Sequence, residues 1–174
     1  RVRKTGLKNL VIGVSGGLDS TLALLVMAEA RKIEPSIKIL GYTLPSKGAT
    51  SSRTKKNAIA LMKALSLDEI HEVPIGVTVK KHLQDIGHPL AYEGEKDTCY
   101  ENAQARMRTY ILMDIANMRQ GLVVGTGDLS ELALGWCTYN GDHMSMYGVN
   151  CSIPKTLVKY LVKAYSQFAK DRKL

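Results

Sequence analysis

The strongest constraint on the fold of this chain is the alternation of short apolar runs with helix-length segments. Asn9 is followed by Leu-Val-Ile-Gly-Val, and residues 121–125 read Gly-Leu-Val-Val-Gly. Short runs that are apolar at almost every position are typical of strands buried on both faces of a parallel sheet. The sequence predicts four strands, at residues 9–14, 37–43, 69–73 and 121–125. We therefore expect an α/β fold with a mostly parallel sheet, helices on both faces and right-handed crossovers.

The segments between these strands predict the helices. We expect helices at residues 18–32, 52–65 and 100–118, and a further helix that begins at Pro154. Two segments are rich in turn residues, so we expect 74–99 to be partly helical and 135–152 to be a loop. The first predicted helix is apolar nearly all round, which indicates cover on more than one side, by the sheet and by a partner subunit.

Length and composition limit the classes of protein. The chain has 174 residues, and we expect residues 1–174 to form a single domain. No apolar run reaches the roughly 18 residues of a membrane span, and no secretory signal is found. The three cysteines form no CxxC pair. We therefore expect a cytoplasmic protein with no membrane partner. The net charge is +8, but the basic residues are dispersed and aromatics make up only 6%. This pattern favours a small polyanionic ligand over nucleic acid.

A glycine-rich loop, Ser15-Gly-Gly-Leu-Asp-Ser20, joins the first predicted strand to the first predicted helix. Backbone N–H groups of such a loop can approach an anion, and the helix N-terminus adds a positive dipole end. The spacing is neither that of a Walker A loop nor GxGxxG. A tight turn capped by Ser15 or Ser20 is the structural alternative. Asp19 favours the functional interpretation, because a carboxylate inside a phosphate cradle needs a cation beside it; Asp19 is therefore a candidate Mg²⁺ ligand.

This loop resembles the SGGxDS loop of the ATP pyrophosphatases, which holds the pyrophosphate of ATP. Three later segments, Tyr100–Arg108, Gly125–Tyr139 and Asn140–Asn150, extend the resemblance. Over about residues 8–162 the chain resembles the NAD⁺ synthetases, most of all the synthetase domain of the glutamine-dependent form. The resemblance implies a Rossmann-like, adenine nucleotide alpha hydrolase-like fold. It also implies ATP-dependent amidation of nicotinic acid adenine dinucleotide to NAD⁺ through an adenylylated carboxylate, with AMP and pyrophosphate as products.

The resemblance also implies roles for particular residues. Residues that would contact ATP are Gly13, Val14, Ser15, Gly16, Gly17, Leu18, Asp19, Ser20, Arg53, Thr126 and Lys155. Residues that would contact the dinucleotide are Asn102, Arg106, Glu131, Trp136, Cys137, Thr138, Tyr139 and Asp142. Asp19 and Glu131 would hold Mg²⁺. The catalytic residues would be Asp19, Thr126 and Lys155.

Two arginines of the predicted helix 100–118 lie on different faces of that helix. Arg106 is four residues from Asn102, so the two share a face. Arg108 lies about 200° further round the helix, and we expect it to be structural. The motif, rather than the spacing, assigns the face of Arg106 to the substrate.

Two alternative functions remain open at this point. One is another SGGxDS ATP pyrophosphatase, of the GMP synthetase or tRNA-modifying kind; the other is a module that binds adenine nucleotide without catalysis. The resemblance further implies a homodimer or higher homo-oligomer, a glutaminase domain that supplies ammonia from glutamine, and a closing segment beyond residue 174. We therefore expect this domain to be part of a longer chain.

Overall fold

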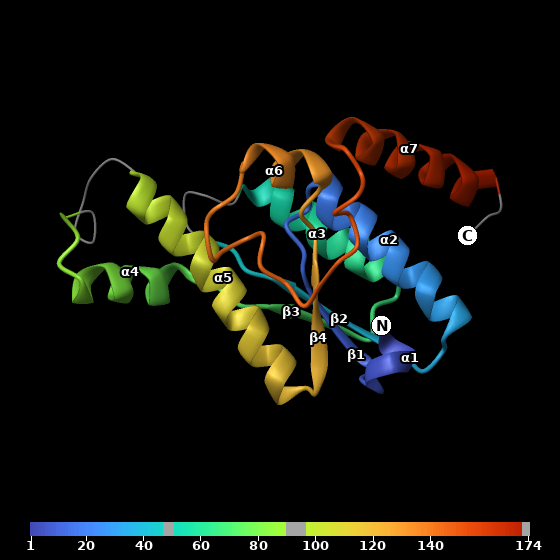
Figure 1. Ribbon diagram of the computed structural model, residues 1–174, viewed down its shortest axis with the longest axis horizontal. Coiled ribbons are helices and arrows are strands. Elements are labelled where there is room, and N and C mark those ends of the chain that lie inside the picture. The colour runs from blue at the N-terminus through green and yellow to red at the C-terminus, as the bar shows by residue number, and fades with distance from the viewer. Residues whose placement is uncertain (47–50, 90–96, 172–174) are drawn as a thin grey trace.

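The computed structural model describes residues 1–46, 51–89 and 97–171, and its centre is a five-stranded parallel sheet (Figure 1). The strands are β1 (Asn9–Gly13), β2 (Lys38–Thr43), β3 (Glu69–Glu72), β4 (Gly121–Gly125) and β5 (Tyr147–Gly148). Their order across the sheet is β3-β2-β1-β4-β5, and every pairing is parallel. The four predicted strands and the parallel α/β class are confirmed. The fifth strand was not predicted, because two residues inside a loop carry no periodic signal.

The described residues contain seven helices. They are α1 (Val2–Thr5), α2 (Leu18–Ile33), α3 (Ser52–Ala64), α4 (Gly76–Asp85), α5 (Thr98–Met118), α6 (Leu129–Leu134) and α7 (Lys155–Asp171). The predicted helices agree with α2, α3, α5 and α7 within two residues at each bound that was given. The partly helical segment contains α4. The helices α1 and α6 were not predicted, because both are too short to show a hydrophobic period.

Helices cover both faces of the sheet, as predicted. On one face, Leu24 and Met27 of α2 and Met62 of α3 pack with Leu10 and Ile12 of β1. On the other face, side chains of α4 and α5, including Leu83 and Ile115, pack with Val11. Successive β1 residues point to opposite faces, and both faces are buried, which explains why this strand is apolar throughout.

The outer side of α2 is covered by α7, which lies along it in Figure 1. Val158 of α7 is fully buried, and the Tyr165 hydroxyl donates a 2.6 Å hydrogen bond to Glu29 Oε1 of α2. This hydrogen bond and burial raise the pKa of Tyr165 to about 12. The prediction that α2 is covered on more than one side is therefore met within the chain. Val26 remains 43% exposed, and the predicted partner subunit stays a prediction.

The order of the strands creates a crevice at one edge of the sheet. From β1 the chain moves outward through β2 and β3, and β4 then pairs with the opposite side of β1. The connections leaving the carboxyl ends of β1 and β4 diverge at this switch point, where open α/β sheets bind their ligands. No helix of the described chain is long and apolar enough to span a bilayer.

Candidate active site

The loop between β1 and α2 forms a compact turn held by its own serines. Ser15 Oγ accepts from the Gly17 N–H at 3.2 Å, and the Ser20 hydroxyl donates to the Gly17 carbonyl at 3.1 Å. Gly16 has a φ of +85°, and a Cβ there would lie 2.4 Å from the carbonyl oxygen of Thr54 in α3. The structural alternative of a serine-held turn is thus present. It leaves the α2 N-terminus without a side-chain cap among the described residues, so the turn and an anion-binding role are compatible.

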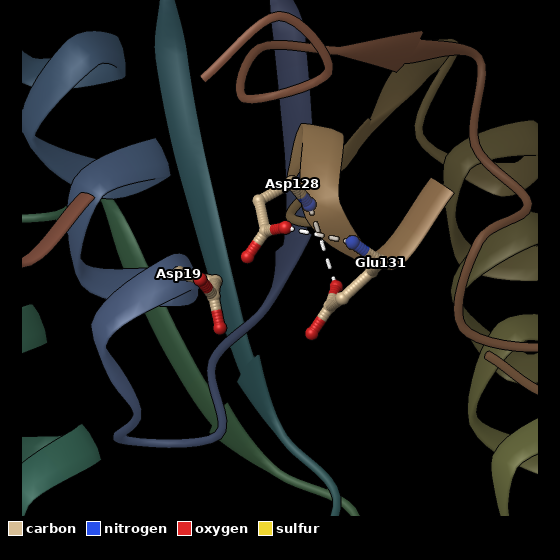
Figure 2. Close-up of side chains that lie close together, drawn as sticks. All are labelled: Asp19, Asp128 and Glu131. Carbon is tan, nitrogen blue, oxygen red and sulfur yellow. Dashed lines mark hydrogen bonds between the residues drawn. The ribbon is translucent and has the colours of Figure 1, made fainter. Parts of the chain in front are cut away.

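Three carboxyl groups meet beside this loop. Asp19 comes from the first turn of α2, and Asp128 and Glu131 come from the start of α6 (Figure 2). One carboxylate oxygen from each lies within 4.8 Å of the others. The Lys155 ammonium, at the first residue of α7, is 2.8 Å from Asp19 Oδ2, 2.7 Å from Asp128 Oδ2 and 2.9 Å from Glu131 Oε1. We call these four side chains the acidic cluster and its lysine.

Local helix chemistry explains two of the acids. Asp128 is the N-cap of α6 and accepts from the Glu131 N–H at 2.9 Å, while Glu131 Oε2 accepts from the Asp128 N–H at 3.4 Å. This is a capping box. Glu131 was predicted as a site residue, and Asp128 was not. The Asp-x-x-Glu pattern was the available signal, but a six-residue helix hid it.

Burial and hydrogen bonding act in opposite directions on Asp128. Its side chain is fully buried, which by itself raises the pKa of a carboxyl group. Hydrogen bonds from Lys155 and from the Glu131 N–H outweigh burial, so the pKa of Asp128 is lowered. Burial lowers the pKa of Lys155, but its contacts with Asp128, Asp19 and Glu131 outweigh this and raise it well above its usual value. Asp128 and Lys155 are therefore both placed to be charged at neutral pH.

The donors of the cluster suit a hard divalent cation. Carboxylate oxygens are the ligands that Mg²⁺ prefers, and it is bound through one or two of them together with phosphate oxygens. Asp19 Oδ1 is buried and has no hydrogen-bond partner among the described residues. Asp19 and Glu131, the two predicted ligands, are thus brought together from two strand ends, and Asp128 stands beside them.

A buried asparagine joins the two strand ends. Asn150 Nδ2 donates to the Asp19 carbonyl at 2.9 Å and to the Thr126 carbonyl at 3.0 Å, and the residue is 1% exposed. Asn150 therefore fixes the β1–α2 connection relative to the end of β4. Nothing local in the sequence marks this role, because both partners are more than twenty residues away.

A cavity of about 430 Å³ opens at this edge of the sheet. The predicted residues that line it are Gly13, Val14, Ser15, Asp19, Ser20, Thr126, Glu131, Cys137 and Asp142. Those that are not among its lining residues are Gly16, Gly17, Leu18, Arg53, Asn102, Arg106, Trp136, Thr138, Tyr139 and Lys155. Burial raises the pKa of the Cys137 thiol, which suits packing rather than nucleophilic attack.

Asn102 and Arg106 share a face of α5, as the spacing predicts, and that face contacts the loop after α6. The Thr138 hydroxyl donates to Asn102 Oδ1 at 2.8 Å, and Arg106 Nε donates to the Tyr139 carbonyl at 3.0 Å. Thr109 adds a 2.7 Å bond to the Gly141 carbonyl. The two predicted residues thus hold the loop of residues 135–146 in the described structure, and their contact with substrate stays a prediction.

Arg108 lines the cavity, although its position on α5 led us to expect a structural role. Its Nε donates to the Leu44 carbonyl at 3.2 Å, at the end of β2. Burial lowers the pKa of its guanidinium, which nonetheless remains charged. Arg108 therefore has both a structural hydrogen bond and a place at the cavity.

Several predicted residues lie away from the cavity. Trp136 and Tyr139 are 80% and 75% exposed. Arg53 is exposed on α3. Of the segment Leu44-Pro-Ser-Lys-Gly, where the resemblance puts adenine and ribose, Leu44 lines the cavity, while Lys47 and Gly48 lie outside the described residues.

The fold and the site define a parallel α/β domain with an anion-binding loop and an acidic cluster at the switch point of its sheet. The chain belongs to the NAD synthase family, whose pattern matches residues 1–167. The expected adenine nucleotide alpha hydrolase-like fold is confirmed by solved members of that family.

Named relatives agree with this family. The chain is 51% identical over 168 residues to the glutamine-dependent NAD(+) synthetase of Mycobacterium tuberculosis, a match that covers 94% of this chain and 24% of that protein. It superposes on the glutamine-dependent NAD+ synthetase of Acinetobacter baumannii, solved with ADP, with a TM-score of 0.83 and 29% identity, over 94% of this chain and 30% of that one. The NH3-dependent NAD synthetase of Campylobacter jejuni gives a TM-score of 0.77 and 25% identity, over 94% and 66%.

The chain spans about a quarter of the length of the curated relative, and the aligned part is similar to its synthetase portion. These matches favour the NAD⁺ synthetase interpretation over the GMP synthetase-like, tRNA-modifying and non-catalytic alternatives.

Proposed function

We propose that this chain catalyses the ATP-dependent amidation of nicotinic acid adenine dinucleotide to NAD⁺, with release of AMP and pyrophosphate. The observation that carries the proposal is the meeting of the uncapped α2 N-terminus, the acidic cluster and the cavity at one edge of the sheet. The names of the relatives, and the ADP bound to one of them, support the same reaction.

The first step joins two anions. A nicotinate carboxylate oxygen forms a bond to the α-phosphorus of ATP, and the bond from that phosphorus to the bridging oxygen breaks, so that pyrophosphate leaves with the electron pair. The residues of this chain would lower the repulsion between the reactants. The loop N–H groups and the α2 N-terminus hold the pyrophosphate, and Thr126 and Lys155 contact ATP.

Asp19 and Glu131 would hold Mg²⁺, which when bound neutralises charge on the phosphate oxygens. The buried, unpartnered Asp19 Oδ1 supports this assignment. Arg108, which lines the same cavity, adds a permanent positive charge to the anion site.

The second step replaces AMP with nitrogen. Ammonia attacks the carbonyl carbon of the adenylate, the bond from that carbon to the AMP oxygen breaks, and the nitrogen loses a proton to give the amide. The adenylate must meet ammonia before water, which requires a sheltered site. We propose that the ammonia is free or is released from glutamine by another part of the intact protein, as the names of the relatives suggest.

The dinucleotide side of the site is formed by α5 and the loop that follows α6. Cys137 and Asp142 line the cavity, and Asn102 and Arg106 hold the loop that carries them. Trp136 and Tyr139 are exposed and do not line the cavity, so we propose that they meet the nicotinate end where the substrate extends beyond it.

We also propose that two copies associate and that the protein works in the cytosol. Apolar side chains exposed on α2, Val26 and Ile33, support a partner surface. The three cysteines all lie in the described part of the chain and are unpaired, which suits a reducing compartment.

The proposed function is tested by product analysis. The protein is supplied with ATP, Mg²⁺, ammonium and nicotinic acid adenine dinucleotide, and NAD⁺, AMP and pyrophosphate are quantified. We expect the three products in equal amounts, and none when the dinucleotide is omitted or replaced by xanthosine monophosphate. Amidation of xanthosine monophosphate, or binding of ATP without any AMP formation, would contradict the proposal.

A further inference from the structure

The Lys155 ammonium contacts all three residues that could hold a metal ion. It is within 2.9 Å of an oxygen from each of Asp19, Asp128 and Glu131. One carboxylate oxygen from each of these three residues lies within 4.8 Å of the others, so the three residues could hold a single cation. A divalent ion and an ammonium could not share these oxygens, because two cations so close together repel strongly at the low effective dielectric of a partly buried site.

The backbone of Lys155 is held in place, but its side chain has room to move. The Lys155 N–H donates to the Ser130 hydroxyl at 3.0 Å, and Val158, one turn later, is fully buried. The side chain itself is 44% exposed. A compact ammonium on a flexible four-carbon stem can therefore change partners while α7 stays in place.

The buried Asp128 carboxylate needs a positive charge beside it both with and without bound nucleotide. Its side chain has no exposed surface, unlike those of Asp19 and Glu131, which are 25% and 28% exposed. A buried carboxylate without a counter-charge is strongly unfavourable. Three carboxylates with one ammonium carry a net charge of −2, whereas the same carboxylates with one divalent ion carry −1, so the ion compensates them better once the ammonium pairs with phosphate instead.

We propose that Lys155 is an exchangeable internal cation: it occupies the metal position in the nucleotide-free protein and moves to the phosphates when the metal–nucleotide complex binds. Asp128, a residue outside the predicted ligand set, is the buried anchor that holds it there. This inference rests on the proposed function, since it uses the same metal and nucleotide. It means that the metal binds poorly alone and enters together with the nucleotide.

The test measures binding of Mn²⁺ alone, without any nucleotide. Titrations followed by the electron paramagnetic resonance signal of free Mn²⁺ compare the wild-type protein with Lys155→Met and with Lys159→Met, a matched control exposed on the same helix. We expect Lys155→Met to bind one Mn²⁺ at least about tenfold more tightly than wild type, because a competing charge is gone. Lys159→Met should match wild type. Equal or weaker Mn²⁺ binding by Lys155→Met would overturn the inference.

A second pair of variants covers the case in which Lys155→Met is unstable. Asp128→Asn keeps an N-cap side chain and removes the buried charge that Lys155 would otherwise have to neutralise. The double variant Asp128→Asn with Lys155→Met is therefore compared with Asp128→Asn alone. The double variant should again bind Mn²⁺ more tightly, and an unchanged affinity would overturn the inference. Product formation by the wild type is measured separately, so failure of the exchange and failure of the proposed reaction give different results.

Discussion

At the scale of single residues, the site consists of charged side chains that are stabilised by other charged side chains of the same fold rather than by water. Asp19 contacts Lys155 through one oxygen and leaves the other buried and unpartnered. Asp128 has no solvent exposure at all. A buried charged group that loses its partner cannot be solvated by water instead, so the loss is costly. Substitutions that keep the shape of the side chain and remove its charge therefore test the role of that charge.

Asp19→Asn should retain the fold and lose Mg²⁺-dependent binding of ATP. The amide removes the negative charge but keeps the shape, and the loss of a charged contact should cost about 1.5–3 kcal/mol of binding free energy. Calorimetric titration with ATP, with and without Mg²⁺, measures the effect, and Asp114→Asn on an exposed part of α5 is the control. Unchanged affinity for MgATP would show that Asp19 is not a ligand.

Asp128→Asn should reduce stability at neutral pH and change its dependence on acid. The pKa of Asp128 is lower in the folded protein than in the unfolded chain, where it is about 3.9. The ionised carboxylate therefore stabilises the fold at pH values above the unfolded pKa, and this stabilisation is lost as the pH falls through the folded pKa. We expect a deficit of about 1–3 kcal/mol at pH 7 that shrinks towards pH 3. Urea unfolding at both pH values measures it. A deficit that is equally large at both would rule out this charge as the cause.

At the scale of secondary-structure elements, α5 and the loop after α6 act as a unit. Three hydrogen bonds, from Thr138, Arg106 and Thr109, join them across more than thirty residues of sequence. Of the predicted dinucleotide contacts, the cavity-lining Cys137 and Asp142 are carried by this loop, so its position sets that side of the site.

Arg106→Ala should loosen this loop and weaken dinucleotide binding more than ATP binding. A hydrogen bond from a charged donor is worth about 1.5–3 kcal/mol, and exposure of Arg106 puts the expected loss at the lower end. Hydrogen exchange over residues 135–146 and the two binding constants are measured together. Arg119→Ala, at the opposite end of α5, is the control. Equal losses for both ligands would mean that Arg106 serves the triphosphate or the fold generally.

At the scale of the whole molecule, the site is assembled by the topology of the sheet. β1 and β4 are neighbours in the sheet but more than one hundred residues apart in sequence, and their carboxyl ends carry the glycine-rich loop and Thr126. Asn150 fastens these ends together, and α7 brings Lys155 back to them.

Asn150→Ala should therefore weaken stability and ATP binding in the same variant. Two buried hydrogen bonds are lost, and the Asp19 and Thr126 carbonyls lose a shared donor, which should cost about 2–3 kcal/mol in unfolding free energy. Thermal unfolding and ATP titration are compared with Asn57→Ala, an exposed position on α3. A loss of stability with unchanged ATP affinity would show that the two strand ends stay aligned without Asn150.

The local rules of the chain determined most of the fold. Apolar runs flanked by turn residues predicted four of the five strands, and long segments of helical character predicted α2, α3, α5 and α7. Each of these segments carries its own pattern of apolar residues, because each is long enough for burial against the sheet to set that pattern. The glycine-rich loop and Asp19 were also visible, since a strand, a turn and a helix start are adjacent in sequence. The short elements α1, α6 and β5 were not, because so few residues carry no period.

Tertiary structure alone decided how the charges meet. Asp19 and Lys155 are separated by 136 residues, and no spacing rule predicts that one ammonium contacts three carboxylates, one of them the unforeseen Asp128. Arg108 was expected to be structural from its position on the helix, yet it lines the cavity beside Leu44, whose carbonyl accepts its hydrogen bond. Such pairings depend on which strand ends become neighbours in the sheet, and that order follows from packing the whole chain rather than from any one segment of it.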